Sequence, residues 1–339
     1  MIGPMDKANL ADFSLAAGDL ETRLSFSALG ERPLMVCDLP MAAPAPSPSG
    51  PILIGVDRLG VLSPPDEAWD VLRTSAPNPP RPWVSVADID TALAQIKATL
   101  ARTPVASSIA AGVVRTGEGL SLEAALTIES LAYSTLLGGQ EFRRWRNDTP
   151  RSPNTDEDGP PVRVERSGDV LRIVLTRPKK RNALSAAMRD GLCDALGLVA
   201  LDPSVERAEL SGEGENFCAG GDFQEFGSAG DLAAAHILRV TASAALAAHR
   251  VRDRLSVRGH GAIVGGGLEI AAAASDFRVQ PGALMWLPEV TMGLVPGAGG
   301  TVTVPRRIGR QRALYMMLTA ARIDAGTALE WALIDGVAA

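Results

Sequence analysis

Three glycine-rich loops in the second half of the chain constrain its fold and chemistry more than any other feature. They read FCAGGD at 217–222, GGGLE at 265–269 and PEVTMGLVPGAGG at 288–300. Glycine lets the backbone turn tightly and approach a ligand closely. A helix that begins at a glycine run also presents unpaired N–H groups, which suit an oxygen that gains negative charge during a reaction. Taken alone, each loop is explained as well by close packing of a strand on a helix as by a role in ligand binding.

The loops lie in a region, 162–339, where strand-like and helix-like segments alternate. This alternation predicts an α/β core with layered sheets. The expected strands lie at 162–165, 170–175, 208–211, 255–257 and 277–279, and the expected helices at 185–201, 231–250, 266–274 and 308–318.

The first half of the chain reads differently. Residues 1–82 are expected to be irregular, because the stretch MAAPAPSPSGP separates two isolated strand candidates at 33–39 and 52–56. Residues 83–147 are expected to be helical, with apolar residues recurring every three to four positions and helix starts at Pro104 and near Ser121. The charged, proline-rich run at 148–161 predicts a linker.

Composition limits the possible roles. The length of 339 residues favours two domains, and the net charge of −6 argues against nucleic-acid binding as the main role. No run of about 20 apolar residues and no secretory pattern occurs, so we expect no membrane span and no secretion. Cys37, Cys193 and Cys218 match neither a disulfide framework nor a zinc cluster, which favours the cytoplasm. Only three histidines occur, so we expect no multi-histidine metal site.

In this order and at this spacing, the three loops resemble the crotonase (enoyl-CoA hydratase/isomerase) superfamily. The upstream segment RPKKRNAL at 177–184 resembles the family's early coenzyme A contact, so the resemblance covers nearly all of 162–339. It implies an α/β fold, a crotonase-like spiral of β-β-α units with a helical cap segment. It also implies an acyl-CoA thioester substrate, with no cofactor besides the coenzyme A that the substrate carries, and a homo-oligomer, either a trimer or a hexamer.

The resemblance assigns roles residue by residue. The backbone N–H groups of Ala219 and Gly266 would form the oxyanion hole, Glu269 and Glu289 the acid/base pair, and Gly297 would help to position water. A solvated first-turn glutamate remains the alternative for Glu269 considered alone. The segments expected to frame coenzyme A contain Lys180, Arg181, Ala183, Gly220, Gly221, Asp222 and Phe223.

Three side chains near these segments can be explained either by a role in the site or by an ordinary structural or surface role. Lys179 adds to the basic turn that would face the phosphates, although such a turn is also explained as a solvated surface. His260 is expected to be structural. Trp286 either narrows the acyl pocket or packs in the core.

Two glutamates at the matched positions favour syn hydration of a 2-enoyl-CoA. That reaction needs water delivered to C3 and a proton to C2, and two neighbouring carboxyls split their pKa values so that one stays protonated near neutral pH. Enoyl-CoA isomerisation and acyl-CoA hydrolysis remain alternatives within the family. A non-catalytic acyl-CoA-binding scaffold is the alternative from a different class.

The order of the segments departs from the family. Residues 83–147 resemble its C-terminal helical region but precede the core, which predicts a helical cap over the site. An unrelated helical domain is the alternative. Residues 1–82 would then be a degenerate remnant of a second crotonase core.

Overall fold

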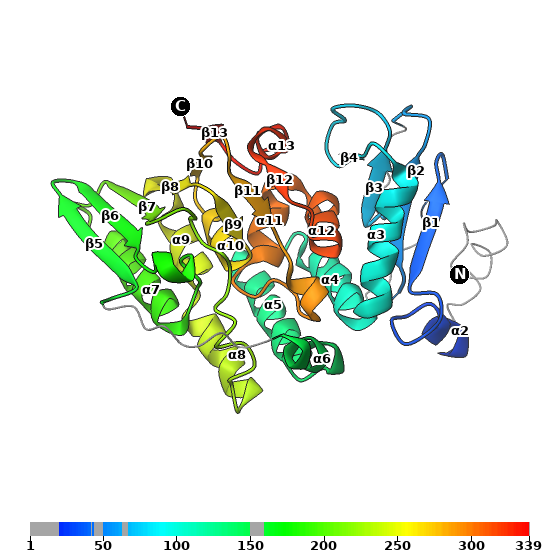
Figure 1. Ribbon diagram of the computed structural model, residues 1–339, viewed down its shortest axis with the longest axis horizontal. Coiled ribbons are helices and arrows are strands. Elements are labelled where there is room, and N and C mark those ends of the chain that lie inside the picture. The colour runs from blue at the N-terminus through cyan, green and yellow to red at the C-terminus, as the bar shows by residue number, and fades with distance from the viewer. Residues whose placement is uncertain (1–19, 42, 44–49, 63–66, 150–158, 339) are drawn as a thin grey trace.

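A six-stranded sheet forms one layer of the C-terminal half in the computed structural model, which describes residues 20–41, 43, 50–62, 67–149 and 159–338 (Figure 1). The strand order is β13-β10-β8-β7-β6-β5, and every neighbouring pair is parallel except the β5–β6 hairpin. The strands are β5 (Val162–Ser167), β6 (Val170–Leu175), β7 (Arg207–Gly212), β8 (Leu255–Gly259), β10 (Asp276–Val279) and β13 (Gly336–Val337).

The expected β-β-α repeat is present. In two successive units the first strand joins the six-stranded sheet and the second joins a smaller sheet of order β12-β11-β9. The units run β8-β9-α10 and β10-β11-α11, and the hairpin β5-β6 with α7 forms an earlier unit. The further elements are β9 (Ala262–Val264), α10 (Gly266–Ala271), β11 (Leu284–Trp286), α11 (Gly300–Ile308), β12 (Ile323–Asp324) and α7 (Ala186–Leu201).

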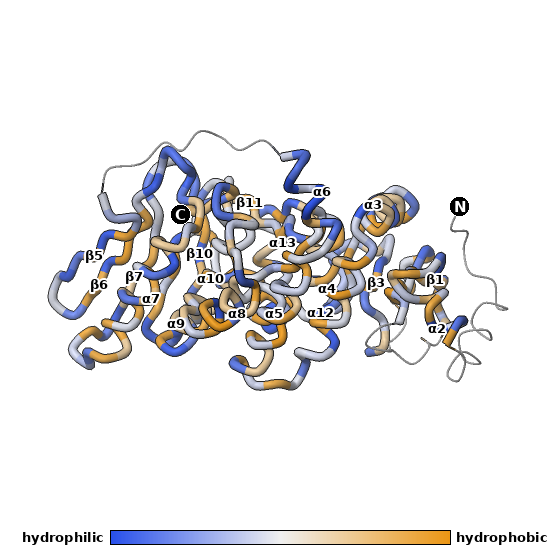
Figure 2. Tube along the Cα trace, turned by 90° about the horizontal axis from the view of Figure 1, so that it is seen from below, coloured by the Kyte–Doolittle hydropathy of each residue, from blue (hydrophilic) through white to orange (hydrophobic). Residues whose placement is uncertain are grey.

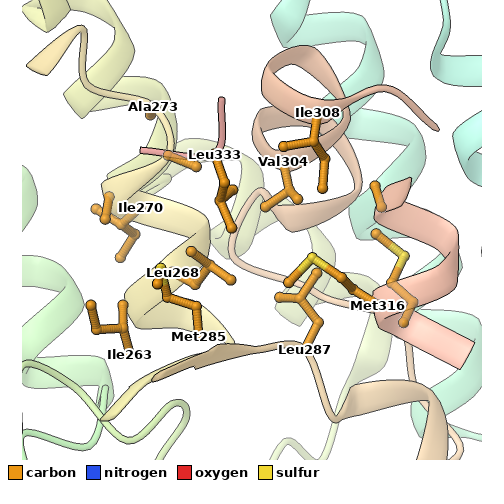
Figure 3. Close-up of a cluster of buried hydrophobic side chains, with 14 of the residues drawn as sticks. Ile263, Leu268, Ile270, Ala273, Met285, Leu287, Val304, Ile308, Met316 and Leu333 are labelled. Carbon is orange, nitrogen blue, oxygen red and sulfur yellow. The ribbon is translucent and has the colours of Figure 1, made fainter. Parts of the chain in front are cut away.

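A tightly packed apolar core lies between the small sheet and the helices (Figure 3). Leu268 and Ile270 of α10 meet Met285 of β11, Val304 of α11 and Met316 of α12 (Arg310–Thr319) in this core. These side chains are almost fully buried, so the position of α10, and with it Glu269, is fixed by packing.

Two helix boundaries differ from expectation. The single helix expected at 231–250 is two helices, α8 (Leu232–Thr241) and α9 (Ala244–Arg250), because Ser243 caps the second by accepting from the Leu246 N–H. The helix expected at 308–318 is α12, separated from α11 by Gly309, whose φ of +87° is a left-handed value that favours glycine.

By length and composition alone, the stretch Leu232–Arg250 could cross a membrane. In the structure it is divided into helices of 10 and 7 residues, and neither reaches the roughly 20 residues that a bilayer requires. Ala245 and Ala248 of α9 are fully buried in the core.

The N-terminal region is not irregular, and that expectation was wrong for its described part, although the two strand candidates at 33–39 and 52–56 are confirmed. Four parallel strands form a sheet of order β1-β2-β3-β4 (Figure 1). The inner strands β2 and β3 are buried along their whole length, as parallel strands covered on both faces usually are. The strands are β1 (Leu34–Asp38), β2 (Ile52–Asp57), β3 (Val71–Thr74) and β4 (Val84–Ser85), preceded by α2 (Leu20–Ser25).

Four helices follow this sheet in the chain (Figure 1). The first two, α3 and α4, contact α12 of the C-terminal core, whereas α5 contacts α8 and α11. The helix starts follow the expected signals: Pro104 is the first residue of α4, and Ser121 caps α5 by accepting from the Ala124 N–H. The helix α6 is strongly hydrophilic (Figure 2). The bounds are α3 (Ile89–Arg102), α4 (Pro104–Gly117), α5 (Leu122–Leu137) and α6 (Gln140–Asp148), and most of the linker expected at 148–161 lies outside the described residues.

Candidate active site

A cavity of about 330 Å³ lies where the helical segment meets the C-terminal core. Its walls come from α5, the start of α7, the loop 221–229, α8, α10 and the loop 297–299. Glu269, Glu289, Gly221, Gly266 and Gly297 all line it. The fold therefore gathers residues from all three glycine-rich loops around one cavity.

Glu269 is held by backbone amides of the third loop. It lies on α10 with only 2% of its surface exposed, and its Oε2 accepts hydrogen bonds from the N–H groups of Ala298 (2.7 Å) and Gly300 (2.8 Å). The other carboxylate oxygen, Oε1, takes part in neither bond. The solvated-glutamate interpretation of Glu269 is therefore wrong.

Glu289 is also buried, but its carboxyl makes fewer hydrogen bonds than that of Glu269. It begins the short 3-10 helix η3 (Glu289–Met292), and its Oε2 is buried without a hydrogen-bond partner among the described residues. Its Oε1 lies against Gly265, where an added Cβ would come within 2.2 Å. Gly265 has a φ of +44°, so both conformation and space favour glycine at this position.

A third buried carboxylate, Glu129, was not anticipated from the sequence. It comes from α5, and its two oxygens accept from the Gly299 N–H (2.7 Å), the Thr301 N–H (2.8 Å) and the Thr301 hydroxyl (2.7 Å). Gly299 lies between the two residues whose amides hold Glu269. The only sequence signal is one glutamate among the apolar residues of LTIESLAY, at 126–133.

Burial raises the pKa of all three carboxyls above the ordinary glutamate value. Burial raises the pKa of Glu269 to about 7, although the amides of Ala298 and Gly300 oppose this by stabilising the anion. Burial and the neighbouring Glu269 together raise the pKa of Glu289 well above its ordinary value. Burial, followed by repulsion from Glu269, raises the pKa of Glu129 to about 8.

The structure corrects one oxyanion-hole assignment. The N–H of Ala219 already donates to the carbonyl of Arg181 at 2.9 Å, and Ala219 does not line the cavity. The N–H of Gly221 has no acceptor among the described residues, and Gly221 lines the cavity. Gly266 is the first residue of α10, so its N–H has no partner within the helix. The available pair of donors is therefore Gly221 and Gly266.

Gly297 lies under an aromatic ring from the helical segment. A Cβ at this position would come within 2.3 Å of the Tyr133 ring, which belongs to α5. The Gly297 N–H has no acceptor among the described residues, so it is available to water or substrate. Tyr133 was not anticipated as part of the site.

The segment expected to contact coenzyme A forms a tight turn. Arg181 and Asn182 have φ values of 51° and 52°, and the buried Asn182 side chain links this turn to the loop at 213–216. Its Oδ1 accepts from the Arg177 N–H, and its Nδ2 donates to the carbonyls of Glu213 and Asn216. Lys180, Arg181 and Ala183 lie on this turn outside the cavity, consistent with contacts to a part of the ligand that projects from it.

The loop after Gly220 is held by one ion pair and by aromatic contacts. The Asp222 carboxylate pairs with Arg177 (2.9 Å), so it orders the loop and is not free for a ligand. Phe223 and Phe226 each pack on Trp145 of α6, with ring centroids 5.4 Å and 6.2 Å away. The helical segment thus also reaches the expected coenzyme A side of the cavity.

Two other side chains lie outside the cavity. A nitrogen of His260, Nε2, lies 3.0 Å from the Gly214 carbonyl, which is consistent with a structural role. Trp286 is half-buried beneath the Arg322 guanidinium, 5.0 Å from its ring centre, and does not line the cavity. Within the described residues, no group of His, Cys, Asp and Glu is placed to hold a metal ion.

Comparisons with known proteins agree with this architecture. The family model for enoyl-CoA hydratase/isomerase matches residues 165–339. The chain is 35% identical to the peroxisomal bifunctional enzyme of Danio rerio over 175 residues, covering 51% of this chain and 23% of that enzyme. It is 32% identical to the 2,3-dehydroadipyl-CoA hydratase of Escherichia coli (strain K12) over 174 residues, covering 51% and 68%.

Among solved structures, an enoyl-CoA hydratase from Mycobacterium smegmatis is similar, with a TM-score of 0.50 and 29% identity. The similarity covers 53% of this chain and 71% of that one. The chain belongs to the enoyl-CoA hydratase/isomerase family, the crotonases. It spans less than two thirds of the length of the first curated relatives, for example 65% of an enoyl-CoA hydratase/isomerase of Bacillus subtilis (strain 168).

Proposed function

We propose that this protein adds water to 2-enoyl-CoA thioesters and produces 3-hydroxyacyl-CoA. The observation that carries the proposal is a pair of buried, unequally hydrogen-bonded carboxyls, Glu269 and Glu289, lining one cavity with the free N–H groups of Gly221 and Gly266. Relatives named as hydratases of 2,3-dehydroadipyl-CoA and (E)-benzylidenesuccinyl-CoA support it.

The two carboxyls take different roles in this mechanism. Two amide donors favour the charged form of Glu269, whereas the unpartnered Oε2 of Glu289 and the nearby Glu269 favour the protonated form of Glu289. Glu269 therefore accepts a proton from the attacking water through its free Oε1. Glu289 supplies the proton that C2 receives.

The reaction balances over one turnover. The water oxygen bonds to C3, and its proton moves to Glu269. The C2–C3 π electrons pass to the thioester, whose oxygen accepts hydrogen bonds from the Gly221 and Gly266 amides as an enolate. The enolate then takes a proton at C2 from Glu289, and exchange with solvent restores both carboxyls. Preorganised donors of this kind are typically worth about 3–4 kcal/mol of barrier each.

The coenzyme A part would lie across the turn that carries Lys180 and Arg181, where cationic side chains suit its phosphates. We also propose that residues 83–147 perform the role of the family's C-terminal helical region. Glu129 and Tyr133 of α5 support this, because they contact the loop that holds Glu269.

The test compares two positional isomers of one acyl-CoA, a 2-enoyl and a 3-enoyl thioester, with product analysis by mass spectrometry. Hydration of the 2-enoyl ester gains the mass of one water and is the expected result. Conversion of the 3-enoyl ester to the 2-enoyl ester without water addition would identify an isomerase. Thermal stabilisation by both esters without any turnover would identify a binding protein.

A further inference from the structure

One guanidinium group that lines the cavity has no carboxylate partner among the described residues. Arg239 of α8 lines the cavity, and none of the described carboxylates forms an ion pair with it. Its Nη1 donates to the Ser130 carbonyl (3.2 Å), the Ser130 hydroxyl (3.0 Å) and the Ser134 hydroxyl (3.1 Å). Its Nε and Nη2 donate to no described residue, and neither atom is fully buried.

The neighbouring groups position this cation without neutralising it. The Arg239 guanidinium lies over the Tyr133 ring, 4.4 Å from its centre. The His236 ring nitrogen Nδ1 lies 2.9 Å from the same Ser130 hydroxyl. The adjacent Glu129 already uses both oxygens on Gly299 and Thr301, and Arg189 is paired with Asp190.

A half-buried cation without a counter-ion is costly unless a ligand supplies one. Burial lowers the pKa of Arg239, which is the expected sign of incomplete solvation. Arginine remains charged at all relevant pH values, and two free N–H donors on one edge match the two oxygens of a carboxylate. A purely aliphatic acyl chain would instead leave the cation facing apolar atoms.

The position favours the acyl end of the ligand over the coenzyme A end. Tyr133, on which Arg239 stacks, contacts Gly297 in the loop next to Glu269. The turn with Lys180 and Arg181 lies outside the cavity, beyond the loop at Gly221 and Asp222. Arg239 is therefore placed to meet the part of the acyl group beyond the reacting carbons.

We propose that Arg239 recognises a carboxylate at the distal end of the acyl group, so that the substrate class is a dicarboxylic acyl-CoA. The inference rests on the proposed function, because it assumes that the thioester binds at Gly221 and Gly266. It goes further by naming the chemical group at the far end of the acyl chain. The reaction at the thioester does not require any particular group there.

The experiment measures binding and not turnover. Two saturated thioesters of equal length, hexanoyl-CoA and the dicarboxylic adipyl-CoA, are titrated into the full-length protein by calorimetry, with free coenzyme A as a third ligand. Neither thioester can be hydrated, so the result does not depend on the reaction. We expect adipyl-CoA to bind at least tenfold more tightly than hexanoyl-CoA.

Three variants locate the effect. Arg239→Met should reduce the preference for adipyl-CoA over hexanoyl-CoA to less than twofold. Arg239→Lys keeps the charge but loses the paired N–H donors of the guanidinium, so it should retain part of the preference. Arg250→Met is the matched control, because Arg250 is an exposed arginine at the end of α9, and it should keep the full preference.

Two results would overturn the inference. Equal binding of the two thioesters by the unmodified protein would show that no carboxylate is recognised. An equal loss of affinity for free coenzyme A in Arg239→Met would show that Arg239 contacts a phosphate of coenzyme A instead. Absence of binding by every thioester would reject the proposed function itself, and this outcome differs from equal binding.

Discussion

At the scale of single residues, the proposed mechanism depends on a difference between Glu269 and Glu289. The two carboxyls share a cavity but differ in their hydrogen bonds. Two amides stabilise the Glu269 anion, whereas the buried Oε2 of Glu289 meets no described donor. A base and an acid can therefore coexist within one cavity at the same pH.

This difference predicts a bell-shaped pH profile for hydration. Glu269 must be ionised, and because its pKa is raised to about 7, kcat/KM should fall as the pH drops through 7. Glu289 must be protonated, so kcat/KM should also fall as the pH rises through its own pKa, which is raised further. Initial rates between pH 5 and 10 check this. An acidic limb near pH 4.5, the ordinary glutamate value, would contradict it.

Some residues of the site could be predicted from the sequence, and others could not. Four residues of the cavity lining could be predicted because each belongs to a contiguous sequence motif: Glu269, Glu289, Gly266 and Gly297. The choice of Ala219 was wrong because its N–H donates to the Arg181 carbonyl. The sequence does not show which backbone N–H groups are already hydrogen-bonded. Glu129, Tyr133 and Arg239 reach the site from distant segments, and no local pattern marks them.

At the scale of elements, α5 is the part of the helical segment that organises the glycine loop. It provides Glu129, whose oxygens hold the backbone at Gly299 and Thr301, while the intervening and flanking amides hold Glu269. The order of the loop thus depends on a helix located about 170 residues earlier in the chain.

Above pH 8, where Glu129 is ionised because its pKa is raised to about 8, Glu129→Gln should weaken both stability and catalysis. An amide has one acceptor oxygen, and its NH₂ group would face N–H donors, which costs about 2–3 kcal/mol of unfolding free energy. The loop around Glu269 would shift, so kcat should fall about tenfold. Urea denaturation and initial rates measure the two effects. The exposed Glu123→Gln on the same helix is the control, and equal behaviour of both variants would refute the role.

Element types were predictable where local signals were strong. The β5–β6 hairpin, the cap at Ser185 and the start of α4 at Pro104 all follow from turn and capping chemistry. The long helix at 231–250 was not divided in the prediction, because its break at Ala242 and Ser243 has no glycine or proline to mark it. The short strands β9, β11 and β12 were missed, because they have only two or three residues.

At the scale of the whole molecule, one buried carboxylate connects the N-terminal sheet, the helical segment and the C-terminal core. Asp70 is fully buried, receives the Leu53 N–H (2.7 Å), and pairs with Arg115 of α4 and Arg310 of α12. Arg312 adds hydrogen bonds from α12 to the Trp83 and Pro79 carbonyls. The N-terminal sheet is therefore attached to the core by polar contacts as well as by packing.

Asp70→Asn should destabilise the whole protein. Two guanidinium groups would lose the carboxylate they share in a buried site, which costs about 3–5 kcal/mol. The control is Asp38→Asn, which removes an exposed pair with Arg58 and should cost less than about 1 kcal/mol. Urea denaturation of both variants compares them. A similar midpoint for Asp70→Asn and the unmodified protein would show that the connection contributes little.

The N-terminal architecture was the least predictable part. Strands β1 to β4 form a parallel sheet although they are separated along the chain, and pairing between separate strands leaves no local period in the sequence. The hypothesis that this sheet is the remnant of a second crotonase core stays a prediction.

The two-carboxyl mechanism is tested by the rate at which Glu289→Gln hydrates crotonyl-CoA, followed as loss of the conjugated-thioester absorbance. Gln keeps the shape of the buried side chain but cannot act as the carboxylic acid that protonates C2. We expect kcat to fall by about 10²–10⁴-fold while circular dichroism shows that the protein stays folded. A folded variant that retains the rate of the unmodified protein would contradict the two-carboxyl mechanism.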